Sequence, residues 1–143
     1  MTGKVDDYGR AMLPVALSAA AGGAVSTVEA WVDTGFTGQL MLPINLVHSL
    51  TLPLLGKATA RLANGKTEEV DRFQCWIEWF GERKPVAALA SLGAFPLLGI
   101  ALLAGHVLTI DYERCTLGLN CPCRSCRRRC VRQREIGTRD RRG

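Results

Sequence analysis

The segment that most restricts how this chain can fold runs from Ala30 to Gly38, with the sequence Ala-Trp-Val-Asp-Thr-Gly-Phe-Thr-Gly. Its first three residues are apolar, as expected of a buried strand. Asp33, Thr34 and Gly35 follow directly, and this combination of short polar residues with glycine favours a tight turn. Such a turn would hold the Asp33 carboxylate within reach of backbone N–H groups. Taken alone, an aspartate in this setting is commonly structural, because its side chain can cap its own turn.

A second segment strengthens the functional interpretation of the first. Pro96-Leu97-Leu98-Gly99-Ile100 consists of apolar residues around a glycine and leads into a short run with helical character. The Asp-Thr-Gly motif and this later glycine segment are both flanked by apolar residues.

The remaining sequence predicts many short strands. Asn64-Gly65 lies between two extended runs, and this dipeptide is a strong signal for a hairpin because both residues tolerate positive φ. Pro43 suits the first turn of a short helix. Frequent turn signals between short strands indicate a closed, mostly β domain. The expected strands cover residues 12–18, 25–32, 37–42, 58–62, 67–73, 74–80, 85–90 and 107–112, and the expected short helices cover 43–50 and 100–104.

This order of elements resembles that of the retropepsin-like aspartic proteases of clan AA. The sequence Asp33-Thr34-Gly35-Phe36-Thr37-Gly38 is similar to that of the small bacterial members of the clan. The resemblance covers residues 10–113, which we interpret as the protease domain. Residues 1–9 would then be an N-terminal extension, and 114–143 a Cys/Arg-rich basic tail. The implied fold is an all-β closed barrel with one or two short helices and a flap hairpin over residues 60–73.

The resemblance also implies that the segment of Leu98 and Gly99 packs behind the active-site loop, and it implies roles for individual residues. Asp33, Thr34 and Gly35 would be catalytic, and the substrate-binding residues would be Phe36, Ala63, Asn64, Gly65, Leu98 and Gly99. In aspartic proteases two carboxylates share one proton and together activate a water and protonate the carbonyl oxygen. This chain has one Asp-Thr-Gly motif, so the mechanism requires a homodimer that contributes Asp33 twice. The expected substrate is a peptide or protein, and no cofactor is implied.

Two other functions remain open from the sequence. The fold could serve as a catalytically inactive module for dimerisation or peptide binding. Alternatively, the protein could associate with nucleic acid through its basic tail, since residues 121–143 carry nine arginines and only two acidic residues. Residues 1–120 carry nine basic and eleven acidic residues, so the net charge of +5 originates in the tail.

The tail also contains four closely spaced cysteines: Cys121, Cys123, Cys126 and Cys130. Thiolates near arginines can bind zinc. Their spacing, however, forms one tight cluster and not two separated pairs. The favoured interpretation is a disordered appendage without a specific role, because high charge with few apolar residues does not support a folded core.

Two features bear on location. Residues 86–110 contain no Asp, Glu, Lys or Arg, which on length alone would permit a membrane span. Glycines, Pro96 and His106 interrupt this stretch, so we expect it to form the core of the protease domain instead. The N-terminus is polar and does not resemble a secretory signal, and no disulfide framework is evident. The sequence therefore predicts a cytoplasmic protein that does not use a membrane.

Overall fold

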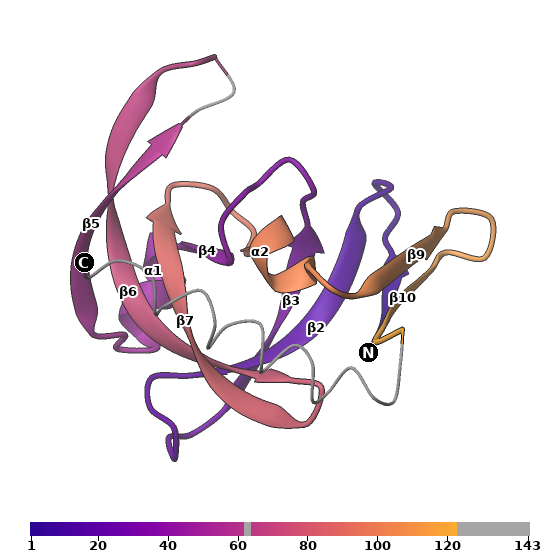
Figure 1. The fold of residues 1–143 in the computed structure, drawn as a ribbon, viewed down its shortest axis with the longest axis horizontal. Coiled ribbons are helices and arrows are strands. Elements are labelled where there is room, and N and C mark those ends of the chain that lie inside the picture. The colour runs from indigo at the N-terminus through magenta and orange to yellow at the C-terminus, as the bar shows by residue number, and fades with distance from the viewer. Residues whose placement is uncertain (62–63, 123–143) are drawn as a thin grey trace, which may run out of the picture.

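The computed structural model describes residues 1–61 and 64–122 (Figure 1). Within these ranges the chain is mostly β-strand with two short helices, as the sequence predicts. The elements in chain order are β1 (Thr2–Val5), β2 (Ala11–Ser18), β3 (Ser26–Val32), β4 (Leu40–Pro43), α1 (Ile44–Ser49), β5 (Leu54–Arg61), β6 (Thr67–Trp79), β7 (Glu82–Ser91), β8 (Leu97–Leu98), α2 (Ile100–Leu103), β9 (Val107–Asp111) and β10 (Thr116–Asn120).

Six of the strands close into a barrel. The sheet order runs β6–β7–β4–β8–β3–β2, and β2 pairs again with β6, where Leu17 lies opposite Ile77. Closure removes the open edges of these six strands. The remaining strands extend the sheet on both sides: β5 beyond β6, and β1, β10 and β9 beyond β2. The predicted closed all-β fold is confirmed.

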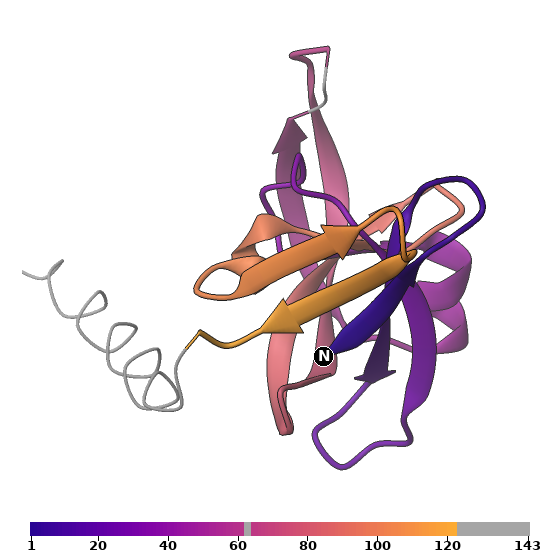
Figure 2. The same cartoon turned by 90° about the vertical axis from the view of Figure 1, so that its right-hand side faces the viewer.

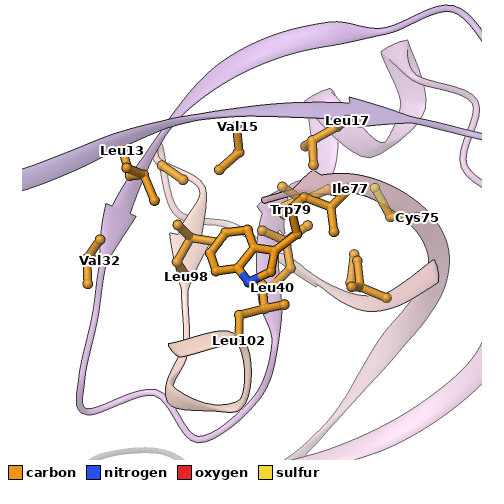
Figure 3. Close-up of a cluster of buried hydrophobic side chains, with 14 of the residues drawn as sticks. Leu13, Val15, Leu17, Val32, Leu40, Cys75, Ile77, Trp79, Leu98 and Leu102 are labelled. Carbon is orange, nitrogen blue, oxygen red and sulfur yellow. The ribbon is translucent and has the colours of Figure 1, made fainter. Parts of the chain in front are cut away.

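Alternating apolar residues of the barrel strands fill the core (Figure 3). On β2, Leu13, Val15 and Leu17 are almost completely buried, as expected for residues two apart on one face of a strand. The Trp79 ring lies among the side chains of Leu40, Leu98, Leu102 and other core residues. The core therefore lies directly behind β3 and β8, the strands that lead into the two sequence motifs.

Two strands differ in extent from the sequence prediction. Residues 67–80 were expected to form two strands meeting at 73–74, but β6 is one strand that pairs with β5 along its first half and with β7 along its second. No glycine or proline interrupts it, so the backbone can pass from one partner to the next. Conversely, β4 begins at Leu40 and not at Thr37. Residues 37–39 belong instead to the loop that follows Asp33.

Both ends of the described chain are part of the sheet. β1 and β10 are antiparallel, with Thr2 opposite Gly118 and Lys4 opposite Thr116 (Figure 2). Leu117 and Leu119 on β10 are buried in the core. These strands lie outside residues 10–113, so the folded unit is larger at both ends than the sequence indicated. A four-residue strand and a glycine-containing strand give weak local signals, and their pairing depends on contacts that are distant in sequence.

Residues 86–110 form parts of β7 and β9, together with β8 and α2. In the part of the chain that the structure describes, no helix is long and apolar enough to cross a membrane. Of the four tail cysteines only Cys121 is described. The other three, Cys123, Cys126 and Cys130, lie outside the described residues, as do most of the predicted tail and Ala63 of the expected flap.

Candidate active site

Asp33 is the first residue after β3, and its backbone is attached to the later glycine segment. β3 and β8 are parallel, with Trp31 opposite Leu97 and Val32 opposite Leu98. The Asp33 N–H donates to the Leu98 carbonyl oxygen at 2.9 Å, which extends this pairing by one residue. The structure therefore brings together the two segments that the sequence analysis selected.

The turn after β3 holds the Asp33 carboxylate at the surface. The Gly35 N–H donates to Oδ1 of Asp33 at 2.9 Å, and the Phe36 N–H donates to the Asp33 carbonyl oxygen at 3.2 Å. The Asp33 side chain is partly buried, whereas Thr34 and Gly35 are exposed. A purely structural turn aspartate would make the same bond to Gly35, so this bond alone does not indicate catalysis. It does fix one carboxylate oxygen and leave the group accessible.

The residues after Leu98 support the turn from behind. The Gly99 N–H donates to the Gln39 carbonyl oxygen at 3.0 Å, and the Ile100 N–H donates to the Phe36 carbonyl oxygen at 2.9 Å. Leu98 is completely buried between β3 and β4, opposite Leu40. Neither Leu98 nor Gly99 presents a surface to a ligand in this structure, which differs from the substrate-binding role implied by the resemblance. Both instead fix the position of the loop 33–39.

Phe36 is packed against two glycines of this site. A Cβ atom at Gly38 would overlap the Phe36 ring, and a Cβ at Gly99 would overlap the same ring and the Gly38 carbonyl oxygen. The ring therefore leaves no space for a side chain at Gly38, whereas at Gly99 the backbone oxygen of Gly38 excludes a side chain as well. Phe36 is partly buried and holds the loop together, which is a structural contact in addition to any contact with substrate.

Comparison with known proteins identifies the fold. No family model and no curated protein matches this sequence. A retropepsin-like aspartic protease from Rickettsia conorii matches the structure with a TM-score of 0.59 and 18% identity, covering 84% of this chain and 89% of that one. The equine infectious anaemia virus (EIAV) protease, solved with an inhibitor, matches with a TM-score of 0.52 and 16% identity, covering 66% and 85%. The fold is that of the retropepsin-like aspartic proteases.

Within this retropepsin-like fold, β5 and β6 form the hairpin predicted from Asn64-Gly65. Gly65 has a φ of 83°, and the Lys66 N–H donates to the Asn64 side-chain oxygen at 3.0 Å. The hairpin projects beyond the barrel (Figures 1 and 2). Positive φ explains the glycine at this tip. The function of the hairpin as a flap remains a prediction, as do the substrate contacts of Asn64 and Gly65.

The sequence analysis missed Gln39, which joins the loop to the barrel wall. Its side-chain Oε1 accepts a hydrogen bond from the Ala87 N–H at 2.9 Å. The partners are 48 residues apart, and no local pattern marks a glutamine for such a contact. Since the Gln39 carbonyl oxygen also binds the Gly99 N–H, one residue joins the loop to β7 and to the start of α2.

The sequence analysis also missed a cluster of aromatic residues around Arg10, which includes Trp31, two residues before Asp33. The Arg10 guanidinium lies 4.1 Å from the centre of the Phe95 ring, and 4.9 Å and 5.9 Å from those of Tyr8 and Trp31. Its Nε donates to Oδ2 of Asp6 at 2.8 Å, and this side-chain hydrogen bond lowers the pKa of Asp6. Because Trp31 is two residues before Asp33, the cluster forms an apolar surface with one ion pair beside the candidate site.

Other chemistry receives little support from the described residues. Burial raises the pKa of the Cys75 thiol to about 11, so this cysteine is protonated at neutral pH and is a poor nucleophile. Residues 1–61 and 64–122 contain no group of three or more His, Cys, Asp or Glu side chains placed to hold a metal ion. Asp33 has an accessible carboxylate on its turn, and its catalytic role stays a prediction.

Proposed function

We propose that this protein is an aspartic endopeptidase, in which Asp33 from each of two identical subunits forms the catalytic pair. The observation that carries the proposal is the position of Asp33. It follows β3 directly, is bonded through its backbone to Leu98 on β8, and exposes its carboxylate on a turn that a retropepsin-like fold supports from behind.

The second carboxylate must come from another copy of the chain. Three of the other aspartates in the described ranges have cationic partners: Asp6 with Arg10, Asp71 with Lys57, and Asp111 with Arg114. None of them follows a strand in an Asp-Thr-Gly turn. A two-fold axis beside the turn of Asp33 would instead place two equivalent carboxylates together, since an isologous interface presents the same surface from both subunits.

The chemistry follows from this juxtaposition. Two carboxylates in contact cannot both ionise easily, so they hold one proton between them. The ionised carboxylate accepts a proton from a water, which attacks the peptide carbonyl carbon. The protonated carboxyl group donates its proton to the carbonyl oxygen, which gives a gem-diol. The C–N bond then breaks as the carboxyl group that received the water proton donates it to the amine nitrogen. The other carboxylate takes a proton from a diol hydroxyl, so the pair again holds one proton. No covalent intermediate with the protein forms, and the bond between Gly35 N–H and Asp33 Oδ1 keeps each carboxylate oriented through the cycle.

An extended peptide is the substrate that suits the surroundings of Asp33. Trp31 and Phe95 are both partly exposed near the turn and can contact apolar side chains on either side of the cut. The β5–β6 hairpin would cover the peptide and pair with its backbone, as sheet edges commonly do with extended ligands.

The test compares cleavage of a diverse peptide mixture by the wild type, Asp33→Asn and Asp7→Asn, with products identified by mass spectrometry. Asp7 is an exposed aspartate outside the site, so Asp7→Asn is the matched control. We expect the wild type and Asp7→Asn to cleave at the same bonds between about pH 4 and 7, where one proton can be shared. We expect Asp33→Asn to lose at least about a thousandfold in rate, because neither carboxylate remains.

A wild type that dimerises and binds peptides without cleaving them would contradict the proposal and identify an inactive binding module. Equal cleavage by the wild type and Asp33→Asn would show that Asp33 is not catalytic.

A further inference from the structure

The face of β6 that fills the barrel core continues into the projecting β5–β6 hairpin. Alternate residues of a strand point to the same side, and in the barrel every second residue of β6 is buried: Phe73, Cys75, Ile77 and Trp79. β6 is one unbroken strand that begins at Thr67. Thr67, Glu69 and Asp71 therefore lie on the side of the hairpin that corresponds to the barrel interior.

Three residues of β5 share this side. Lys57, Thr59 and Arg61 lie directly opposite those three residues of β6, and opposite residues of an antiparallel pair point to the same side. The pairing is regular over this stretch. We call these six residues the core-side face of the hairpin. The outer face over the same stretch consists of Ala58, Ala60, Glu68 and Val70.

Charged residues are concentrated on the core-side face. Its six residues include two cations and two carboxylates, whereas the outer face carries one charged residue and is otherwise alanine and valine. A hairpin that packed this face onto the barrel would show the opposite pattern, because charged side chains are costly to bury. Glu69 and Arg61 are exposed although they lie on the core side. The barrel therefore leaves this face of the hairpin accessible.

Glu69 is the carboxylate of this face that stays available to a ligand. The Lys57 Nζ lies 3.5 Å from Oδ1 of Asp71, so these two side chains balance each other. Glu69 lies opposite the uncharged Thr59 and takes part in no ion pair within the residues that the structure describes. Arg61 is its diagonal neighbour on the same face, and a basic group of a ligand can replace it.

The surface beside Asp33 has a different character. The hairpin and the loop of Asp33 project from the same end of the barrel in both views (Figures 1 and 2). Beside this loop, Trp31 and Phe95 are partly exposed around Arg10, whose charge is balanced by Asp6 at 2.7 Å. A peptide held between the hairpin and the loop would therefore meet an apolar surface without net charge on one side and a charged face on the other.

We propose that Glu69 determines specificity, and that the substrate is an extended peptide in which apolar side chains alternate with basic ones. Successive side chains of an extended chain point to opposite sides. One set would contact Trp31 and Phe95, and the other would place a lysine or arginine against the Glu69 carboxylate. The inference rests on the proposed function, which brings the peptide between the hairpin and Asp33.

The test measures the binding of short fluorescent peptides to the Asp33→Asn protein by anisotropy, because this variant should hold a peptide without cutting it. The peptides alternate leucine with lysine, glutamine or glutamate. We expect the lysine peptide to bind at least about threefold more tightly than the glutamate peptide, with the glutamine peptide between them. Adding Glu69→Lys should reverse this order, and adding Glu69→Gln should remove the preference.

Glu68→Lys is the matched control. It changes the charge of the protein by the same amount at the neighbouring position, but on the outer face, so the order of the three peptides should stay as it is without this substitution. An unchanged order in Glu69→Lys and Glu69→Gln would overturn the inference. So would an equal reversal by Glu68→Lys, which would indicate an effect of overall charge, or a failure of all three peptides to bind.

Cleavage of the same peptides by the proteins with Asp33 intact separates this inference from the proposed function. Cleavage without a preference for lysine would retain the protease function and overturn the role of Glu69. A preference for lysine that depends on Glu69, in a protein that cleaves nothing, would retain this face as a peptide-binding surface and reject the protease function.

Discussion

The packing of Phe36 shows how a single side chain shapes the candidate site. Its ring fills the space above Gly38 and Gly99 and so closes the loop that carries Asp33. Asp-Thr-Gly was recognisable from sequence because a turn after an apolar run is a local pattern. The reason for Gly38, the second glycine of the motif from Asp33 to Gly38, was not recognisable from sequence. It depends on where the Phe36 ring lies in three dimensions.

This contact leads to a prediction at the scale of the residue. Gly38→Ala should destabilise the protein by about 1–3 kcal/mol, because the added methyl group overlaps the Phe36 ring. In a Phe36→Ala background the same substitution should cost much less, giving a coupling of at least about 1 kcal/mol in a double-mutant cycle of urea unfolding. Gly99→Ala is the control: its methyl group would also meet the Gly38 carbonyl oxygen, so Phe36→Ala should not restore it. Additive effects of the first pair would contradict this account.

At the scale of elements, the start of β4 depends on a side chain. Gln39 occupies the position before Leu40, and its Oε1 accepts the Ala87 N–H just before the backbone pairing of β4 with β7 begins. The sequence analysis expected this strand to begin at Thr37. In the structure the strand begins only at Leu40, because tertiary contacts hold residues 37–39 in the loop of Asp33. Similar long-range contacts decide that β6 is continuous and that β9, and not β10, is an edge.

Removing this contact should therefore destabilise the protein. Gln39→Ala leaves the partly buried Ala87 N–H without its acceptor and should lower the free energy of unfolding by about 1–2 kcal/mol in urea. Gln39→Glu keeps an acceptor oxygen at the same distance and should cost less. A larger loss for Gln39→Glu than for Gln39→Ala would show that the hydrogen bond to Ala87 is not the important interaction of this side chain.

For the whole molecule, the sequence predicted the closed barrel and the contact between its two motifs but gave boundaries that were too narrow. The barrel strands have strong apolar patterns with turns between them. β1 and β10 are short, contain glycine, and acquire their stability from each other across almost the whole described chain. Cys75, Trp79 and the leucines of β2 were visible as apolar residues, but nothing in the sequence indicated that Leu119 would bind the backbone of Met1.

Truncation tests the importance of the added strands. A chain that ends at residue 113 lacks β10 and loses the burial of Leu117 and Leu119, which should cost at least about 3 kcal/mol. A chain that ends at residue 122 retains every strand that the structure describes and should melt close to the full-length protein. Circular dichroism during thermal unfolding measures both. Equal melting temperatures for the two truncated chains would show that β10 contributes little to the stability of the barrel.

The pairing of β1 with β10 also has a consequence for biosynthesis. β1 is the first strand of this sequence to leave the ribosome, but the strand that holds it on one side is the last one described. Contacts between distant parts of a chain form slowly because the loop between them must close first. The β2–β3 and β6–β7 hairpins can form while the chain is still growing. β1 can pair with β2 early, but its other edge must wait until β10 emerges, so this part of the sheet is among the last to be completed.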